Sequence, residues 1–269
     1  MRWCGMVTVA FHSYRGGTGK STLAANFAAE VALRGQRVGL LEFDTLSPGL
    51  KVMFDVEMPP RKRYLNDLLC GEGTVEEAVL DLTSTLNNGF DRGLGRLFLL
   101  PASHRGEDIF KLLRDGYNAH QCVEVIKNFQ EQFDLDFLFI DTHPGFEEDT
   151  LIALTASDMV VIVLRMDEQD YFGARIAVDI SKTIGKRLYL LFNMVPYELS
   201  NSSEACLLIN GIKKFLETPV IGVIPFYRDV LAATGRRLFV VDRRNHPFSL
   251  AINNIVSRFM EEFEDWTEF

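Results

Sequence analysis

The sequence predicts an α/β fold: a doubly wound, mostly parallel β-sheet flanked by helices. Seven short runs are continuously apolar rather than alternating, which is typical of strands covered on both faces. Amphipathic segments separate these runs, and this alternation favours right-handed crossovers between parallel strands. A glycine-rich stretch joins the first apolar run to the first amphipathic segment, where α/β folds often bind phosphate.

Each element has its own signal along the chain. The expected strands are residues 6–13, 37–44, 96–103, 136–141, 159–166, 187–195 and 219–225. The expected helices are residues 20–34, 63–70, 74–81, 106–133, 170–184, 203–216 and 248–265. Gly35 is well placed to end the first helix, and Gly116 is expected to break the segment 106–133.

Composition limits the class of protein. The chain has 269 residues and no repeat or linker, so a single domain is expected over residues 1–269. Its net charge of -9 argues against non-specific DNA binding. The four cysteines form no C-x-x-C pair, so they suggest neither a zinc knuckle nor a redox pair, and reduced thiols in a cytoplasmic protein are expected. No apolar run approaches the roughly 20 residues that span a bilayer.

The stretch HSYRGGTGKST, residues 12–22, predicts a phosphate-binding loop because it lies between a predicted strand and a predicted helix. Its glycines let successive N–H groups converge on phosphate oxygens, and the helix N-terminus adds partial positive charge. Lys20 would reach the β- and γ-phosphates, and the Ser21 hydroxyl would bind magnesium. The expected nucleotide-binding residues are Gly16, Gly17, Thr18, Gly19, Lys20, Ser21 and Thr22.

Two positions depart from the general pattern G-x-x-x-x-G-K-[ST]: Tyr14 replaces the first glycine, and Arg15 adds a cation. The form [K/R]-G-G-x-G-K-[ST] resembles the deviant Walker A loop of the MinD/ParA family of P-loop ATPases, in the SIMIBI class. In that family the cation is a lysine that crosses to the partner subunit and touches its nucleotide. The resemblance implies the same catalytic role for Arg15, whose planar fork suits phosphate. A solvated or structural role for Arg15 is the alternative.

Acidic residues at two strand ends resemble the two switches of this family. The stretch LLEFDTLSPG, residues 40–49, places Glu42 and Asp44 on one face of an extended chain. The resemblance implies that Asp44 orients or activates the attacking water and that Glu42 is a partner of the metal. The stretch DFLFIDTHPGF, residues 136–146, resembles the Walker B strand and second switch. There Asp141 would hold Mg²⁺ and the Gly145 amide would contact the γ-phosphate.

The later chain resembles the adenine pocket of the same family. Asn193 lies near the end of a predicted strand, where the family's asparagine reads adenine through its amide. Residues 223–235 resemble an Ile-Pro segment that lines the base around Pro225. The resemblance therefore runs from residue 6 to about residue 260. It implies ATP and Mg²⁺ as cofactors.

The resemblance implies an ATP-binding and ATP-hydrolysing dimerisation switch. It would form an ATP-dependent homodimer, hydrolyse slowly, and respond to a regulatory or cargo protein. Its cargo would be division, motility or partition machinery. Two alternatives are an ATP-dependent metabolic ligase or synthetase of similar fold, and a nucleotide-bound adaptor that hydrolyses poorly.

Attachment to membranes or DNA is less favoured. Family members that bind membranes use a basic amphipathic C-terminal helix, whereas this chain ends in MEEFEDWTEF, which anionic lipid would repel. Phe263, Trp266 and Phe269 could instead dock a protein partner. The pairs Arg236–Arg237 and Arg243–Arg244 leave DNA binding possible but not favoured at this net charge.

Overall fold

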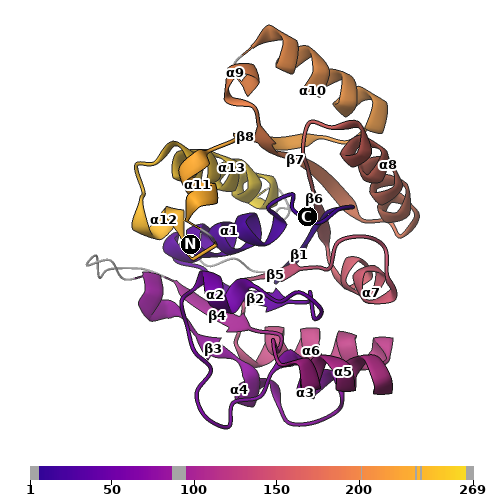
Figure 1. Ribbon diagram of the computed structural model, residues 1–269, viewed down its shortest axis with the longest axis vertical. Helices are drawn as coiled ribbons and strands as arrows, with labels where there is room; N and C mark the ends of the chain where they lie inside the picture. Colours follow the sequence, from indigo (N-terminus) through magenta and orange to yellow (C-terminus); the bar gives the residue numbers. More distant parts are fainter. Residues whose placement is uncertain (1–5, 87–94, 201, 234, 237, 265–269) are drawn as a thin grey trace.

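A central β-sheet with helices on both faces dominates the fold (Figure 1). The computed structural model describes residues 6–86, 95–200, 202–233, 235–236 and 238–264, and this part of the chain forms an eight-stranded sheet. Its order is β3-β4-β2-β5-β1-β6-β7-β8, parallel throughout except between β3 and β4. The strands are β1 (Val7–His12), β2 (Arg37–Glu42), β3 (Leu80–Asp81), β4 (Arg96–Leu100), β5 (Phe137–Asp141), β6 (Met159–Leu164), β7 (Arg187–Val195) and β8 (Val220–Pro225).

Two layers of helices cover the sheet. One face packs against α1 (Lys20–Leu33), α2 (Leu50–Met53), α12 (Phe239–Asp242) and α13 (Pro247–Glu264). The other face packs against α3 (Leu65–Leu69), α4 (Val75–Ala78), α5 (Gly106–Asp115), α6 (Ala119–Gln132), α7 (Glu148–Ala156), α8 (Glu168–Thr183) and α10 (Ser203–Leu216). The connections hold η1 (Thr83–Leu86), α9 (Tyr197–Ser200) and α11 (Arg228–Ala232). This architecture is the predicted doubly wound α/β fold.

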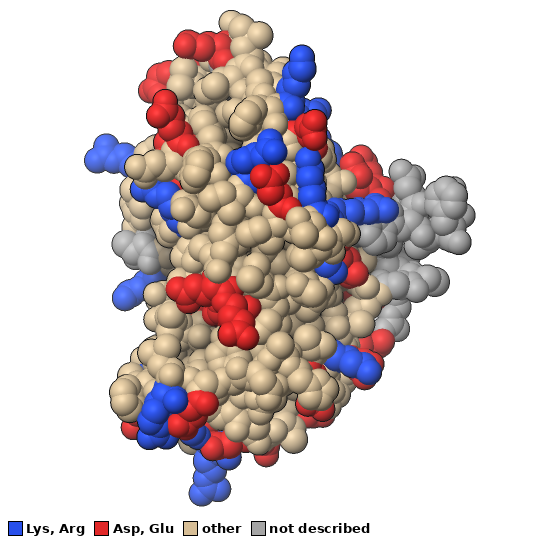
Figure 2. Space-filling model, turned by 90° about the vertical axis from the view of Figure 1, so that its right-hand side faces the viewer, with Lys and Arg blue, Asp and Glu red and all other residues tan. Residues whose placement is uncertain are grey.

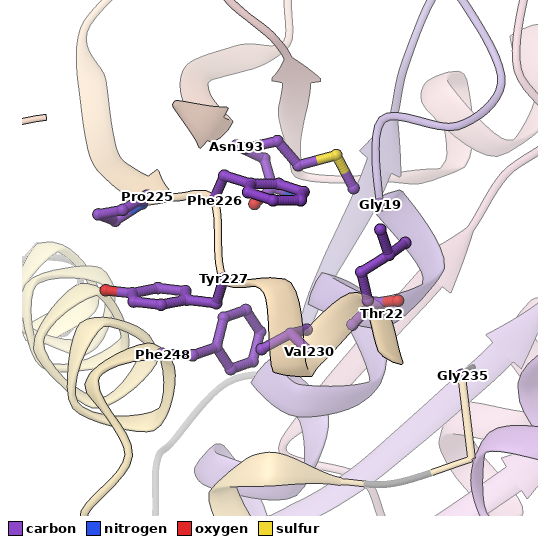
Figure 3. A pocket seen from close by; sticks show the side chains of 11 residues that line it. Gly19, Thr22, Asn193, Pro225, Phe226, Tyr227, Val230, Gly235 and Phe248 are labelled. Atoms are coloured by element: carbon purple, nitrogen blue, oxygen red, sulfur yellow. The ribbon is translucent and has the colours of Figure 1, made fainter. Parts of the chain in front are cut away.

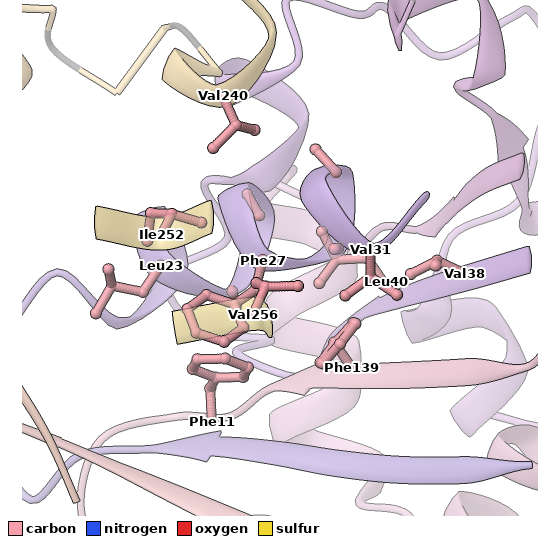
Figure 4. Packing of buried hydrophobic residues seen from close by; sticks show 14 of the residues in the cluster. Phe11, Leu23, Phe27, Val31, Val38, Leu40, Phe139, Val240, Ile252 and Val256 are labelled. Carbon is pink, nitrogen blue, oxygen red and sulfur yellow. The ribbon is translucent and has the colours of Figure 1, made fainter. Parts of the chain in front are cut away.

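Packing of α1 against the sheet fixes the position of the loop that precedes it. The Phe27 ring meets Phe11 of β1 edge-on at 5.2 Å (Figure 4). It also meets Phe259 of α13 at 6.3 Å. All three rings are fully buried. Each buried side chain of this size contributes about 1.5–3 kcal/mol to folding. The start of α1 is therefore held firmly against the end of β1.

The structure differs from the sequence predictions mainly in short elements. An eighth strand, β3, was not expected because two residues are too few to show an apolar pattern. It also ends the helix predicted over 74–81 at Ala78, since Leu80 and Asp81 pair with β4 instead. Helix α7 was missed as well: it has nine residues and no clear apolar stripe.

The remaining predictions concern the last helix, the cysteines and membrane-spanning segments. Ile252, Val256 and Phe259 of α13 are fully buried in the cluster that joins this helix to the sheet. The side chain of Phe263 and all of Trp266, Phe269, Arg237 and Cys4 lie outside the described residues. Cys70, Cys122 and Cys206 are free thiols. Within the described ranges, no helix is sufficiently long and apolar to traverse a lipid bilayer.

The charged side chains at the surface are relevant to the prediction of DNA binding. Figure 2, which views the side that carries α7 and α8, shows acidic and basic side chains interspersed on that face. Arg243 forms an ion pair with Asp229 at 3.3 Å and lies over the ring of Phe239. DNA binding by the arginine pairs stays a prediction.

Candidate nucleotide site

The loop between β1 and α1 has a backbone shape suited to phosphate binding. Gly17 and Gly19 have φ of 78° and 83°, in the left-handed region that favours glycine. A Cβ on Gly19 would also lie 2.4 Å from Nδ2 of Asn193, so both conformation and space require glycine. Helix α1 begins directly afterwards at Lys20, so its positive dipole end faces the loop.

Lys20 and Asp141 form a buried ion pair beside this loop. The Lys20 Nζ donates to Oδ1 of Asp141 at 2.5 Å, and the two side chains are only 6% and 2% exposed. Asp141 ends β5, in register with Phe11 of β1 and with Glu42 of β2. Lys20, Asp141 and Glu42, which the sequence analysis placed in one site, therefore lie close together at the ends of these strands.

Glu42 is held by backbone amides. Its Oε1 accepts from the N–H groups of Gly49 and Leu50 at 2.6 Å, and its Oε2 accepts from Ala102 at 3.0 Å. Burial raises the pKa of Glu42 to about 7, and the nearby charge of Asp141 acts in the same direction. Glu42 therefore anchors the segment after β2, and its role as a metal partner stays a prediction.

The two switch segments both approach the phosphate loop. In the first switch, burial raises the pKa of Asp44, and the positive charge of Lys20 opposes that rise. Oδ1 of Asp44 accepts a hydrogen bond from the Ser47 amide at 2.9 Å. In the second switch, the Gly145 amide donates to the carbonyl of Ser13 at 3.0 Å. This amide, predicted to contact the γ-phosphate, therefore already lies against the loop.

An aromatic cluster explains the unusual Tyr14. Its ring lies 6.0 Å from Phe146, which lies 4.9 Å from the fully buried His12. A Cβ on Gly173 of α8 would come within 2.1 Å of Tyr14, so this glycine provides the space for the ring. Burial, together with the charge of Lys20, lowers the pKa of His12 to about 3, so the ring is neutral. Sequence analysis missed this role of His12, Phe146 and Gly173.

A pocket of about 200 Å³ opens beside the start of α1 (Figure 3). Asn193 donates from Nδ2 to the carbonyl of Thr18 at 2.7 Å, so the side-chain amide of this pocket residue is hydrogen-bonded to the phosphate loop. Gly19, Thr22, Asn193 and Pro225, all predicted from sequence, line this pocket together. The structure adds Phe226, Tyr227 and Phe248, whose flat rings suit a planar base.

Arg15 lies apart from the buried pair, on the α8 side of the loop. Its NH1 lies 3.5 Å from Oδ1 of Asp167 and 3.8 Å from Oδ1 of Asp170, and its side chain is 39% exposed. Asp167 caps α8 by accepting from the Asp170 amide at 2.9 Å. Sequence analysis missed both acids, although the D-x-x-D spacing directly after strand 159–166 was a visible signal. Their proximity to Arg15 depends on β6 lying next to β1.

The site fits a nucleotide and a hydrated magnesium ion. The Thr18 hydroxyl in the loop is buried without a hydrogen-bond partner among the described residues. Across the same residues, no group of three or more His, Cys, Asp or Glu side chains forms a ready metal cage. Mg²⁺ commonly takes one or two protein oxygens, with phosphate and water supplying the rest. Ser21 and Asp141 can provide these protein oxygens beside the loop.

Comparison with known proteins identifies the family. A family model described as "AAA domain" matches residues 6–189, from β1 into β7. The septum site-determining protein MinD of Synechocystis is 26% identical over 251 residues, covering 91% of this chain and 86% of that protein. The chain belongs to the MinD/ParA family of P-loop ATPases. An uncharacterised ATP-binding protein of Methanocaldococcus jannaschii is 28% identical, covering 94% and 88% of the two chains.

Solved structures show that the MinD/ParA fold extends over nearly the whole chain. MinD of Pyrococcus horikoshii, complexed with Mg-ADP, gives a TM-score of 0.75 at 19% identity and covers 95% of this chain and 96% of its own. The MinC:MinD complex of Aquifex aeolicus gives a TM-score of 0.76 at 22% identity, with coverage of 95% and 96%. At these identities the likeness concerns the fold.

Proposed function

We propose that this MinD/ParA-family ATPase binds ATP with Mg²⁺, dimerises in that state, and acts as a slow, partner-stimulated switch. The observation that carries the proposal is Arg15, a cation beside the phosphate loop that is 39% exposed and lies 3.5 Å from Asp167 and 3.8 Å from Asp170. A guanidinium in this position can leave its own subunit and reach phosphate in another. The Mg-ADP complex of a structural relative supports the choice of cofactor.

Lys20 would exchange one anionic partner for another when nucleotide binds. In the structure it neutralises the buried Asp141. It would turn to the β- and γ-phosphates, which frees the Asp141 carboxylate to hold the metal with Ser21. Magnesium, when bound, would offset the negative charge of these phosphates. Asn193 and Pro225 would orient the adenine in the adjoining pocket.

Asp44 would orient or deprotonate the water that attacks the γ-phosphorus. Its pKa is raised by burial, which makes it a better proton acceptor than a solvated aspartate. The bond from the γ-phosphorus to the bridging oxygen breaks, ADP leaves with that oxygen, and phosphate takes the water oxygen. Lys20 and the Arg15 of the second subunit would stabilise the developing charge.

The cellular role follows from relatives rather than from residues in this chain. One relative is named a septum site-determining protein, and a flagellum site-determining protein of Helicobacter pylori is 29% identical over 187 residues. We therefore propose that residues 1–269 form one cytoplasmic ATPase domain that positions or recruits cellular machinery through a protein partner.

Light scattering tests the proposal directly. Molar mass is measured with ADP and then with ATP and Mg²⁺ for wild type, Asp44→Ala and Arg15→Ala. Asp44→Ala should trap ATP and double in mass, while Arg15→Ala should stay monomeric. Arg175→Ala, which removes an exposed ion pair with Asp179 on α8, is the matched control. A monomeric mass in every sample would contradict the switch and favour a ligase or an adaptor.

A further inference from the structure

Two arginines share the pair of carboxylates at the start of α8. Besides Arg15, Arg165 reaches both acids: its NH2 lies 3.1 Å from Oδ2 of Asp167, and its Nε lies 3.1 Å from Oδ2 of Asp170. The backbone N–H of Arg165 also donates to Asp170 at 2.9 Å. The contacts of Arg15 with the same acids are longer, at 3.5 and 3.8 Å. Arg165 is therefore the stronger counter-charge.

Because Asp170 is buried, its carboxylate needs a cation beside it. Asp170 is only 2% exposed, and a buried carboxylate that loses its cation is strongly destabilised. Its Oδ2 accepts from Arg165, while its Oδ1 has no hydrogen-bond partner among the described residues. When Arg15 departs, Arg165 still neutralises Asp170. Without Arg165, departure of Arg15 would leave the buried charge uncompensated.

We infer that Arg165 is a positioning residue that frees Arg15 to act on a second copy of this chain. By holding Asp167 and Asp170, it keeps the contacts of Arg15 within its own subunit weak. Arg165 directly follows β6, the neighbour of β1, so the sheet order places it beside the phosphate loop. The inference rests on the proposed function, because Arg165 matters in this way only if Arg15 leaves its own subunit to contact a second one.

The first test measures Arg15 in the ADP-bound protein, where no partner subunit is needed. Phenylglyoxal modifies accessible guanidinium groups, and peptide mass spectrometry gives the labelling rate of Arg15. Arg165→Met should slow this labelling roughly tenfold, because Asp170 then keeps Arg15 as its one ion-pair partner among the described residues. Adding Asp170→Asn should restore the rate, and Arg175→Met should not change it. An unchanged rate in Arg165→Met would overturn the inference.

A second measurement follows dimerisation in the Asp44→Ala background with ATP and Mg²⁺. Arg165→Met should weaken the dimer roughly tenfold, with rescue by Asp170→Asn and with ADP affinity within about twofold of the parent. A merely structural role would instead lower ADP affinity and resist rescue, which would overturn the inference. If labelling slows but the parent stays monomeric, the restraint on Arg15 is real and the proposed switch is wrong.

Discussion

The two cations of the phosphate loop occupy opposite surroundings. Lys20 is 6% exposed and contacts Asp141 at 2.5 Å, whereas Arg15 is 39% exposed and contacts its nearest acid at 3.5 Å. A buried charge that loses its partner is strongly destabilised, so Lys20 can leave Asp141 only in exchange for another anion, while a half-exposed contact at long distance contributes little stability. This difference fits the proposal that Lys20 serves the nucleotide of its own subunit while Arg15 serves that of a second subunit.

The largest effect is expected from Lys20→Met. It removes the phosphate contact and leaves Asp141 buried without its cation, so unfolding should become easier by about 3–5 kcal/mol. ATP affinity should fall by roughly 10–100-fold, the value of a charged hydrogen bond. Fluorescent-nucleotide titration and chemical denaturation measure the two quantities. Lys182→Met, which breaks an exposed pair with Glu217, should cost less than about 1 kcal/mol. Equal losses of stability in Lys20→Met and Lys182→Met would contradict the difference between the buried and the exposed cation.

The next effect is kinetic. Asp44→Ala should lower the rate of ATP hydrolysis by roughly 10²–10⁴-fold, because the water loses its proton acceptor. ATP affinity should change little, because Asp44 contacts Ser47 rather than the phosphate loop. Single-turnover hydrolysis with a phosphate sensor gives the rate, and Asp179→Ala on α8 is the control. A rate close to wild type would remove Asp44 from the mechanism.

Glu42 predicts a dependence of stability on pH. Burial raises its pKa from 4.5 to about 7 in the folded protein, so folding favours the protonated carboxyl. Its contribution is complete below pH 4.5 and is lost as the pH rises through 7, a change of about 3 kcal/mol.

Glu42→Gln isolates this contribution, because other titrating groups are common to both proteins. Denaturation at pH 4.5 and 8 should show that wild type loses roughly 3 kcal/mol relative to the variant. A constant difference between the two proteins would show that the amide hydrogen bonds to Glu42 outweigh its burial.

The smallest effect is expected from weakening the contact between Arg15 and Asp167. Asp167→Asn keeps the cap of α8 but removes one negative charge from beside Arg15. The ATP-dependent dimer should become roughly two- to fivefold tighter, as expected for an exposed ion pair. Analytical ultracentrifugation in the Asp44→Ala background measures it. A weaker dimer would mean that Asp167 contributes to the interface instead of restraining Arg15.

Residues that belong to a contiguous motif could be predicted from sequence, whereas residues that depend on strand order could not. Lys20 and Asp141 each follow from a local pattern, and parallel strands bring their ends together. The contact of Arg15 with Asp167 required knowing that β6 neighbours β1. The three amides that hold Glu42 come from segments up to 60 residues away, and loops of this kind have no sequence period.

A mixing experiment tests the central claim most directly. Arg15→Ala keeps its own Lys20 and Asp44, while Asp44→Ala can supply Arg15 to a neighbour. If Arg15 acts across the dimer, mixing the two inactive proteins with ATP and Mg²⁺ should restore hydrolysis at one of the two sites in each mixed dimer, because that site has its own Asp44 and the Arg15 of the partner subunit. If Arg15 acts within its own subunit, every site lacks one group and the mixture stays inactive, which would contradict the account.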